Sequence, residues 1–181
     1  ITDRIFYRFR PRLNKPTAAT SLDNLAKATD MLYAGFRLSD KWAVTIGKMC
    51  QAWGGFEFDL NPMNIYEYSD FIENMDNFML GGMVTFAPNA NHEFNLQITD
   101  VRNDSFETLY GTPADINASK APLTYIFNWN GNLFNGLLQT RYAVGLQSEA
   151  EGYNNTMLTL GNKLNFSKFQ VFFDYIEQMN S

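Results

Sequence analysis

The sequence predicts an all-β protein in which antiparallel strands follow one another in an up-and-down sheet, and three observations support this. First, segments of strand length alternate apolar with polar residues, as in residues 93–98, where Phe94, Leu96 and Ile98 share one face. Second, aromatic residues make up 15% of the chain, and strands favour them. Third, short turns alternate with long loops along the chain, which places the two kinds of connection at opposite ends of the sheet.

About nine segments carry the alternating pattern. They are residues 2–13, 28–38, 41–49, 77–87, 91–101, 122–129, 136–146, 156–166 and 169–178. Short turns are expected at residues 39–40, 88–91, 130–132 and 167–168; the third, Asn130-Gly-Asn, has residues that tolerate positive φ. Long loops are expected at residues 14–27, 51–76 and 103–121, and an acidic loop of moderate length at residues 148–154; residues 21–27 are compatible with one helical turn.

The insert at residues 51–76 is aromatic and acidic, and it is far too long for a hairpin turn. Residues 65–75 place apolar side chains at helical spacing, which predicts a short amphipathic helix. The insert either folds inward as a constriction loop or forms an acidic cap outside the strands. Its candidate site residues are Trp53, Glu57, Asp59, Tyr66, Glu67 and Asp70.

Composition excludes several classes of function. A net charge of −5 and a pI near 4.8 argue against a nucleic-acid binder. A single cysteine, Cys50, and a single histidine, His92, exclude a disulfide framework and a cysteine- or histidine-rich metal site. Glu57 and Asp59 have no histidine or nucleophile nearby in the sequence, so we expect neither an enzyme nor a cofactor. The clusters at residues 103–104 and 115–117 carry oxygen ligands that calcium uses, but solvated loops explain them more simply.

The same pattern predicts a transmembrane barrel. No window approaches the run of apolar residues that a transmembrane helix needs, whereas a transmembrane strand needs only alternation. Short turns at one end, long loops at the other and aromatic residues near strand ends are typical of outer-membrane barrels. The aromatic residues near strand ends are Tyr7, Trp42, Phe78, Phe86, Trp129, Phe166, Phe169 and Tyr175.

Arginines mark the water-filled side of this predicted barrel. Arg8, Arg10 and Arg12 share one strand face, and an arginine facing lipid near the bilayer midplane costs about 2–4 kcal/mol. We therefore expect a lumen wall that attracts anions, the alternative being a solvated wall without selectivity. The residues expected to line it are Arg8, Arg10, Arg12, Arg37, Gln97, Gln139 and Arg141.

Two other architectures fit the strand pattern. A soluble ligand-binding barrel of the lipocalin type would point its apolar faces inward and use the insert as a lid. A complete small outer-membrane barrel of eight or ten strands would keep the apolar faces outward. The polar faces here are rich in Asn, Gln, Thr and Gly but modest in Lys and Glu, which favours a water-filled lumen over a soluble outer surface.

One stretch also resembles a known family. Gly47-Lys48 leads into Gln51-Ala-Trp-Gly-Gly-Phe-Glu-Phe-Asp-Leu-Asn-Pro and then Ile65-Tyr-Glu-Tyr-Ser-Asp-Phe, which resembles outer-membrane porins of the phosphate-selective porin O/P type, especially those of Bacteroidetes. The resemblance implies a passive diffusion channel for small hydrophilic solutes in the bacterial outer membrane, an inward loop, and homotrimers. It also implies that the chain is part of a larger barrel of about 16–18 strands. The family's phosphate-binding basic residues do not match position by position, so no phosphate site is carried over.

Overall fold

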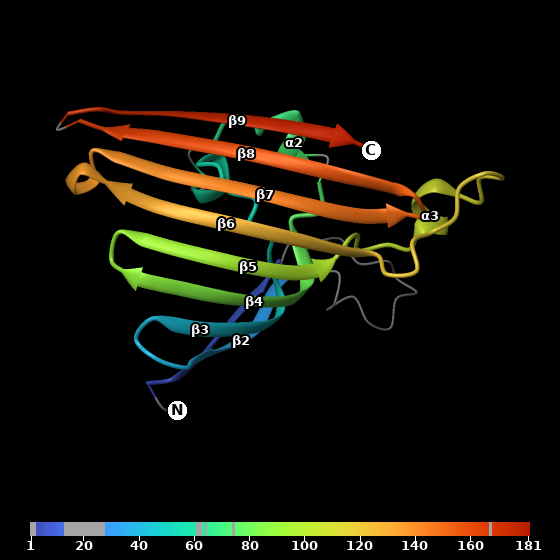
Figure 1. Cartoon of the computed structure of the whole chain (residues 1–181), viewed down its shortest axis with the longest axis horizontal. Coiled ribbons are helices and arrows are strands. Elements are labelled where there is room, and N and C mark those ends of the chain that lie inside the picture. Colours follow the sequence, from blue (N-terminus) through green and yellow to red (C-terminus); the bar gives the residue numbers. More distant parts are fainter. Residues whose placement is uncertain (1–2, 13–27, 61–62, 64, 74, 167) are drawn as a thin grey trace.

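The computed structural model describes residues 3–12, 28–60, 63, 65–73, 75–166 and 168–181. Nine strands in this part form one open antiparallel sheet in which each strand pairs with its neighbours in the chain (Figure 1). They are β1 (Ile5–Pro11), β2 (Thr29–Arg37), β3 (Trp42–Cys50), β4 (Phe78–Asn89), β5 (His92–Asp100), β6 (Leu123–Leu133), β7 (Leu138–Ala150), β8 (Tyr153–Asn165) and β9 (Gln170–Asn180). The prediction of an all-β, up-and-down antiparallel sheet is confirmed.

Four short turns join β2 to β3, β4 to β5, β6 to β7 and β8 to β9 at one end of the sheet, as predicted (Figure 1). The predicted turn at Asn130-Gly-Asn is wrong, because β6 continues to Leu133. The chain turns instead through η3 (Phe134–Gly136), where Phe134 and Asn135 have φ of 53° and 56°.

The loop predicted at residues 148–154 is also wrong. β7 continues through Ala150 and β8 begins at Tyr153, which leaves a tight turn at Glu151 and Gly152. Gly152 has φ of 77°, a conformation that glycine adopts without the steric cost of a Cβ atom. The remaining connections at this end, at residues 12–28, 51–77 and 101–122, are long, as predicted.

Helices in the described residues are short, and most of them lie in the long connections. Besides η3, which lies in the short turn between β6 and β7, they are η1 (Glu57–Asp59), α2 (Asp70–Glu73) and α3 (Phe106–Tyr110). The helix predicted over residues 65–75 is confirmed only at α2, and α3 falls in a stretch predicted as loop, where Ser105 caps it by accepting a hydrogen bond from the Thr108 backbone. The turn predicted at residues 21–27 lies outside the described residues. None of the helices in the described part is long and apolar enough to cross a membrane.

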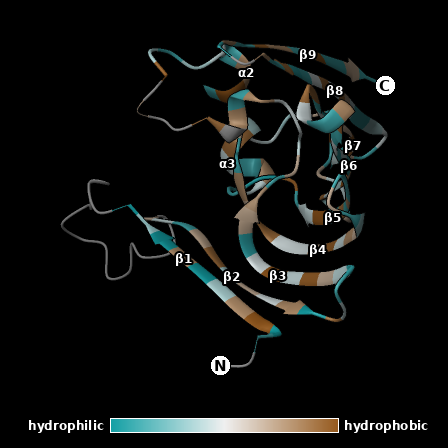
Figure 2. Ribbon diagram, turned by 90° about the vertical axis from the view of Figure 1, so that its left-hand side faces the viewer, coloured by the Kyte–Doolittle hydropathy of each residue, from teal (hydrophilic) through white to brown (hydrophobic). Residues whose placement is uncertain are grey.

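The sheet has one apolar face and one polar face. Leu96, Ile98 and Val144 are 54%, 42% and 45% exposed on the outer face. The alternate positions on β5 to β8 carry buried polar side chains, including Gln97, Thr99, Thr124 and Thr159. Figure 2 shows the sheet bending around the segment between β3 and β4, which lies on its concave side. Burial of polar residues beneath this segment reverses the usual arrangement of a soluble β domain.

Aromatic side chains form a row across the outer face near the short turns. The register pairs Trp42 with Phe86, Phe86 with Phe94, Phe94 with Trp129 and Trp129 with Tyr142. Their ring centroids lie 4.4, 6.4, 6.4 and 5.5 Å apart along the row. Such neighbours on adjacent strands stabilise the sheet through direct ring contacts.

Candidate functional site

The segment after β3 runs along the inner face of the sheet and is bound to it by polar side chains. Gln51 donates a hydrogen bond from Nε2 to Thr99 Oγ1 over 2.8 Å, and the Ala52 backbone donates to Gln97 Oε1 over 2.7 Å. Gln97 Nε2 in turn donates to the Cys50 carbonyl over 3.0 Å. Gln97 is expected from the sequence to face water, but its side chain is fully buried in this contact. Gln97 instead fixes the segment to β5.

Trp53 is the apolar anchor of this segment. It is 1% exposed and packs against Ile126, Ala143 and Met157, which come from β6, β7 and β8. Its indole Nε1 donates to Gln51 Oε1 over 3.0 Å, so the polar atom of this buried ring is satisfied. The ring lies directly over Gly145, where an added Cβ would be 2.2 Å from it.

Beyond Trp53, the segment continues toward β9. Gly54 and Gly55 have φ of 71° and 76°, a region that favours glycine. The Gly55 backbone donates to the Arg141 carbonyl over 3.0 Å, and the ring of Phe56 lies 5.2 Å from the Arg141 guanidinium. The inward course of residues 51–58 thus places main chain and aromatic rings beside a cationic side chain of the wall.

A cavity of about 730 Å³ lies between this segment and the first strands. Four arginines that the strand pattern placed on the polar face line it: Arg8 and Arg10 from β1, Arg37 at the end of β2, and Arg141 from β7. Glu93 of β5 is the carboxylate that lines it among the described side chains. The cavity therefore carries an excess of positive charge.

Neighbouring groups hold the arginines in place. Arg37 donates from Nη1 to the Asp3 carbonyl over 2.8 Å, and its guanidinium lies 5.2 Å from the Phe6 ring. Arg10 lies 4.7 Å from the Phe78 ring and donates to Asp30 over 3.0 Å. Such ring contacts orient a guanidinium without neutralising its charge.

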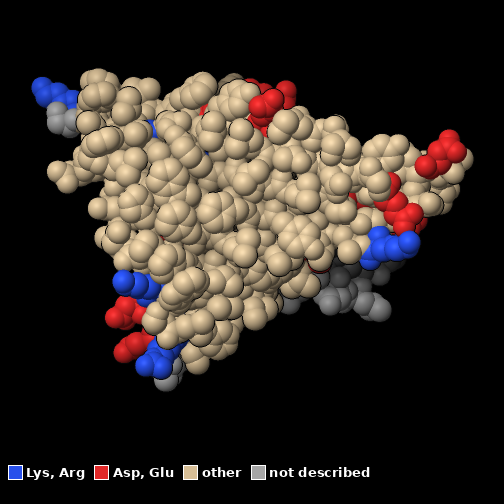
Figure 3. Space-filling view, viewed as in Figure 1, with Lys and Arg blue, Asp and Glu red and all other residues tan. Residues whose placement is uncertain are grey.

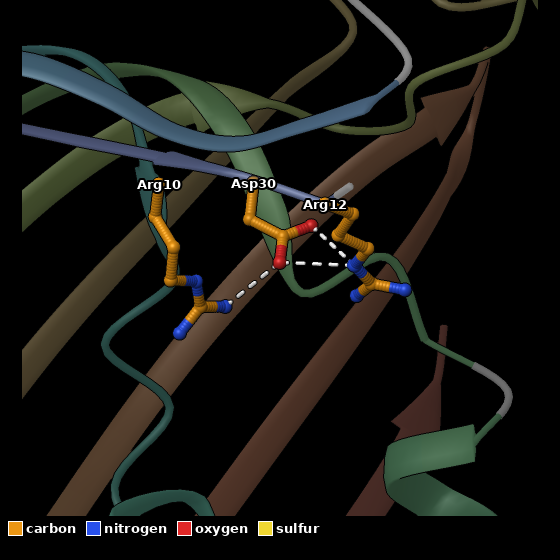
Figure 4. Close-up of polar contacts among 3 residues, drawn as sticks. All are labelled: Arg10, Arg12 and Asp30. Carbon is orange, nitrogen blue, oxygen red and sulfur yellow. Dashed lines mark hydrogen bonds and ion pairs between the residues drawn. The ribbon is translucent and has the colours of Figure 1, made fainter. Parts of the chain in front are cut away.

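Arg12 belongs to a different cavity from the other arginines. Its Nε donates to Asp30 over 2.8 Å, so Asp30 joins Arg10 and Arg12, as Figure 4 shows. Arg12 and Asp30 line a second cavity together with Lys48 and several carboxylates, whereas Arg10 lines the first cavity. The face shared by Arg8, Arg10 and Arg12 thus serves two adjoining spaces.

The other predicted site residues are spread more widely. Gln139 and Arg141 line a cavity near the short turns. The Glu57 carboxylate accepts a hydrogen bond from the Ser69 backbone over 2.6 Å, within the insert itself. Tyr66, Glu67 and Asp70 are exposed, and the side chain of Asp59 lies outside the described part. The structure thus brings Trp53 and the arginines together with the inner wall, but not these carboxylates.

Sequence reasoning did not single out Glu93, Lys163 or Asp174. Lys163 Nζ lies 5.9 Å from the Phe56 ring, and Asp174 Oδ2 accepts hydrogen bonds from the Phe56 and Glu57 backbones. Strand parity was the signal available for all three, since each stands on the polar face of its strand. The loop residue that each of these side chains contacts depends on tertiary structure, which strand parity does not predict.

The long connection after β5 is linked to the end of β7. Arg102 pairs with Glu149 over 2.9 Å, and Tyr110 donates to the same Glu149 oxygen over 2.9 Å. Burial lowers the pKa of Arg102, but the hydrogen bond and charge of Glu149 outweigh it, and the pKa lies above its ordinary value. Burial, together with the bond to Glu149, raises the pKa of Tyr110.

In the described part, no three His, Cys, Asp or Glu side chains converge to hold a metal ion.

Comparison with known proteins identifies a family. No curated protein and no solved structure matches the chain. The family described as phosphate-selective porin O and P matches residues 1–181, the whole chain. This match covers every strand of the sheet and the inward segment. The chain therefore belongs to the phosphate-selective porin O and P family.

Proposed function

We propose that this chain forms the wall and the narrow part of a water-filled channel in the bacterial outer membrane. Small hydrophilic solutes pass through it by passive diffusion, and anions are favoured over cations. The family match supports the channel and its membrane, and the cavity lined by Arg8, Arg10, Arg37 and Arg141 is the observation that supports the preference for anions. Fixed positive charge along a narrow aqueous path concentrates anions and repels cations.

The outer face has the character that a lipid-facing wall requires. Figure 3 views the molecule as in Figure 1, and charged side chains gather at the two ends of the broad surface over the strands and at one place on its upper edge, while its middle carries almost none. Large apolar residues are exposed there, with Leu96 and Val144 near the middle of their strands. The aromatic row from Trp42 to Tyr142 near the short turns suits one membrane interface, where aromatic rings are enriched.

The two edge strands of the sheet need partner strands in a membrane. In hydrocarbon, every backbone N–H and C=O group needs an internal partner, which is why transmembrane sheets close into barrels. In the strand order, β1 and β9 are the two edges and do not pair with each other. We infer that further strands close the wall, giving a barrel of about 16–18 strands in which residues 51–76 form the constriction loop.

The lipocalin-like alternative has lost its main support. Such a barrel keeps apolar side chains inside around its ligand and polar side chains outside. Here the fully buried inner residues include Gln97, Thr124 and Thr159, whereas Leu96 and Ile98 are exposed outside. A requirement for detergent in solution separates the two functions, because a lipocalin-like protein needs none.

Current measurements across planar lipid bilayers test the proposal. Under a KCl gradient, the reversal potential of the full protein should have the sign that chloride flow gives. Arg8→Gln should lower the chloride-to-potassium permeability ratio by roughly fivefold, since one nearby charge in water contributes about 1 kcal/mol. Lys120→Gln is the matched control, because it removes the same charge from a side chain that is 92% exposed on a loop. A cation-selective protein, or equal loss in both variants, would contradict the preference for anions.

A further inference from the structure

β9 carries one carboxylate on its inner face, and this group binds the inward segment from the far side of the sheet. Asp174 Oδ2 accepts hydrogen bonds from the Phe56 backbone N over 2.7 Å and from the Glu57 backbone N over 2.9 Å. Asp174 and Ile176 are the two residues of β9 that are not exposed, and Ile176 packs against the Trp53 cluster. Both shielded positions of this edge strand therefore contact the segment or the core beneath it.

The main chain around Asp174 is shaped to let this contact form. Gly161 of β8 pairs with Arg141 on one side and Asp174 on the other. A Cβ at Gly161 would lie 2.8 Å from Asp174 Oδ1 and 2.8 Å from the Gly55 Cα atom. A Cβ at Gly55 would lie 3.2 Å from Asp174 Oδ2. The two glycines thus leave the space through which the carboxylate reaches the backbone.

The Asp174 carboxylate accepts hydrogen bonds from the backbone at the start of η1, and no side chain of the segment takes this role. Phe56 precedes η1, and no side chain of the segment caps that helical turn. The backbone N–H groups of Phe56 and Glu57 would lose their acceptor without Asp174, and a buried donor without an acceptor is costly. A carboxylate that accepts two backbone N–H groups also makes stronger bonds than a neutral acceptor.

The residue held by Asp174 lies beside the arginine-lined cavity. The Phe56 ring is 5.2 Å from the Arg141 guanidinium, and Gly54, Gly55 and Phe58 line the same cavity as Arg141. We propose that Asp174 is a positioning residue, which fixes the inward segment to β9 and thereby sets the width of the pathway past Arg141. This proposal rests on the proposed channel function.

Hydrogen exchange measured by mass spectrometry tests the attachment without reference to transport. In the full protein in detergent, Asp174→Ala should speed exchange in the peptide containing Phe56 and Glu57 by about tenfold or more, because bonds to a charged acceptor are lost. Asp174→Asn keeps the shape and one acceptor oxygen, so its effect should be smaller. Glu177→Gln is the control, since it removes the same charge from an exposed residue on β9. Unchanged exchange in Asp174→Ala would overturn the proposal.

Single-channel recording then tests the effect on the pathway. Asp174→Ala should raise the conductance and the current fluctuations of the open channel, and Glu177→Gln should leave both as in the wild type. Faster exchange with wild-type conductance and fluctuations would overturn the claim that Asp174 sets the pathway width. A wild-type protein that forms no channel would remove both the channel function and the claim on width, while the exchange data alone would decide the attachment. Heat-modifiable migration on gels checks that each variant folds.

Discussion

At the scale of single residues, Trp53 is the buried aromatic anchor that holds the inward segment on the sheet. It joins three strands through Ile126, Ala143 and Met157, and its side chain is almost completely buried. Tyr66, from the same insert, is fully exposed. The two aromatic residues therefore allow a direct comparison of a buried anchor with a solvated neighbour.

Trp53→Ala should lower the free energy of unfolding by about 3–5 kcal/mol, because it removes a large buried side chain and leaves a cavity. Tyr66→Ala should change it by less than about 0.5 kcal/mol, as expected for an exposed position. Urea titration of the protein in detergent, followed by far-UV circular dichroism, measures both values. Equal losses in the two variants would mean that Trp53 is not the anchor of the segment.

At the scale of elements, the link between α3 and β7 has a distinctive pH dependence. The Tyr110 hydroxyl donates to Glu149, and the pKa of Tyr110 is raised above its ordinary value of 10.0. A raised pKa in the folded state means that the neutral phenol is the form the fold stabilises. Its contribution is therefore complete below pH 10 and is lost as the pH rises through the raised pKa.

We expect α3 to exchange its backbone amides faster at alkaline pH, beyond the intrinsic increase in exchange rate, as Tyr110 ionises beside the Glu149 carboxylate. Tyr110→Phe should remove this additional pH dependence and should already loosen α3 at neutral pH, by about 1 kcal/mol for the lost hydrogen bond. Hydrogen exchange of residues 101–122 across this pH range is the measurement. An identical pH profile in the two proteins would contradict the assignment.

The elements also show what sequence reasoning can reach. Alternation located all nine strands, because side-chain parity is a local property that survives folding. It misplaced the turn at Asn130-Gly-Asn, because Gly131 serves packing: a Cβ there would lie 2.4 Å from Thr140 Oγ1. Parity also placed the arginines on one face, and they line common cavities. The partners of Gln97 and Asp174 were beyond its reach, since they are more than 40 positions away in the chain.

At the scale of the whole molecule, the outer face should tolerate apolar residues and reject charge. Leu96→Arg should impair folding into lipid vesicles by about 2–4 kcal/mol, the cost of an arginine facing lipid near the bilayer midplane. Gln139→Arg should be tolerated, because Gln139 lines a cavity on the inner face. The folded fraction in vesicles across a urea series measures both, and a soluble outer face would show no penalty for Leu96→Arg.

The homotrimer that the resemblance implies stays a prediction, which chemical cross-linking in native membranes addresses.

The attachment of Phe56 to Asp174 also has a geometric consequence for the wall. Six strand spacings separate β3 from β9, or about 29 Å along the sheet at the usual spacing. The chain makes six residue-to-residue steps from Cys50 to Phe56, which span at most about 21 Å when fully extended. The segment is thus a chord beneath the arc of β3 to β9, and the bonds to Asp174 close only if that arc is deep enough. A flatter wall would separate Phe56 from Asp174, so the radius of the wall and the position of the segment cannot vary independently.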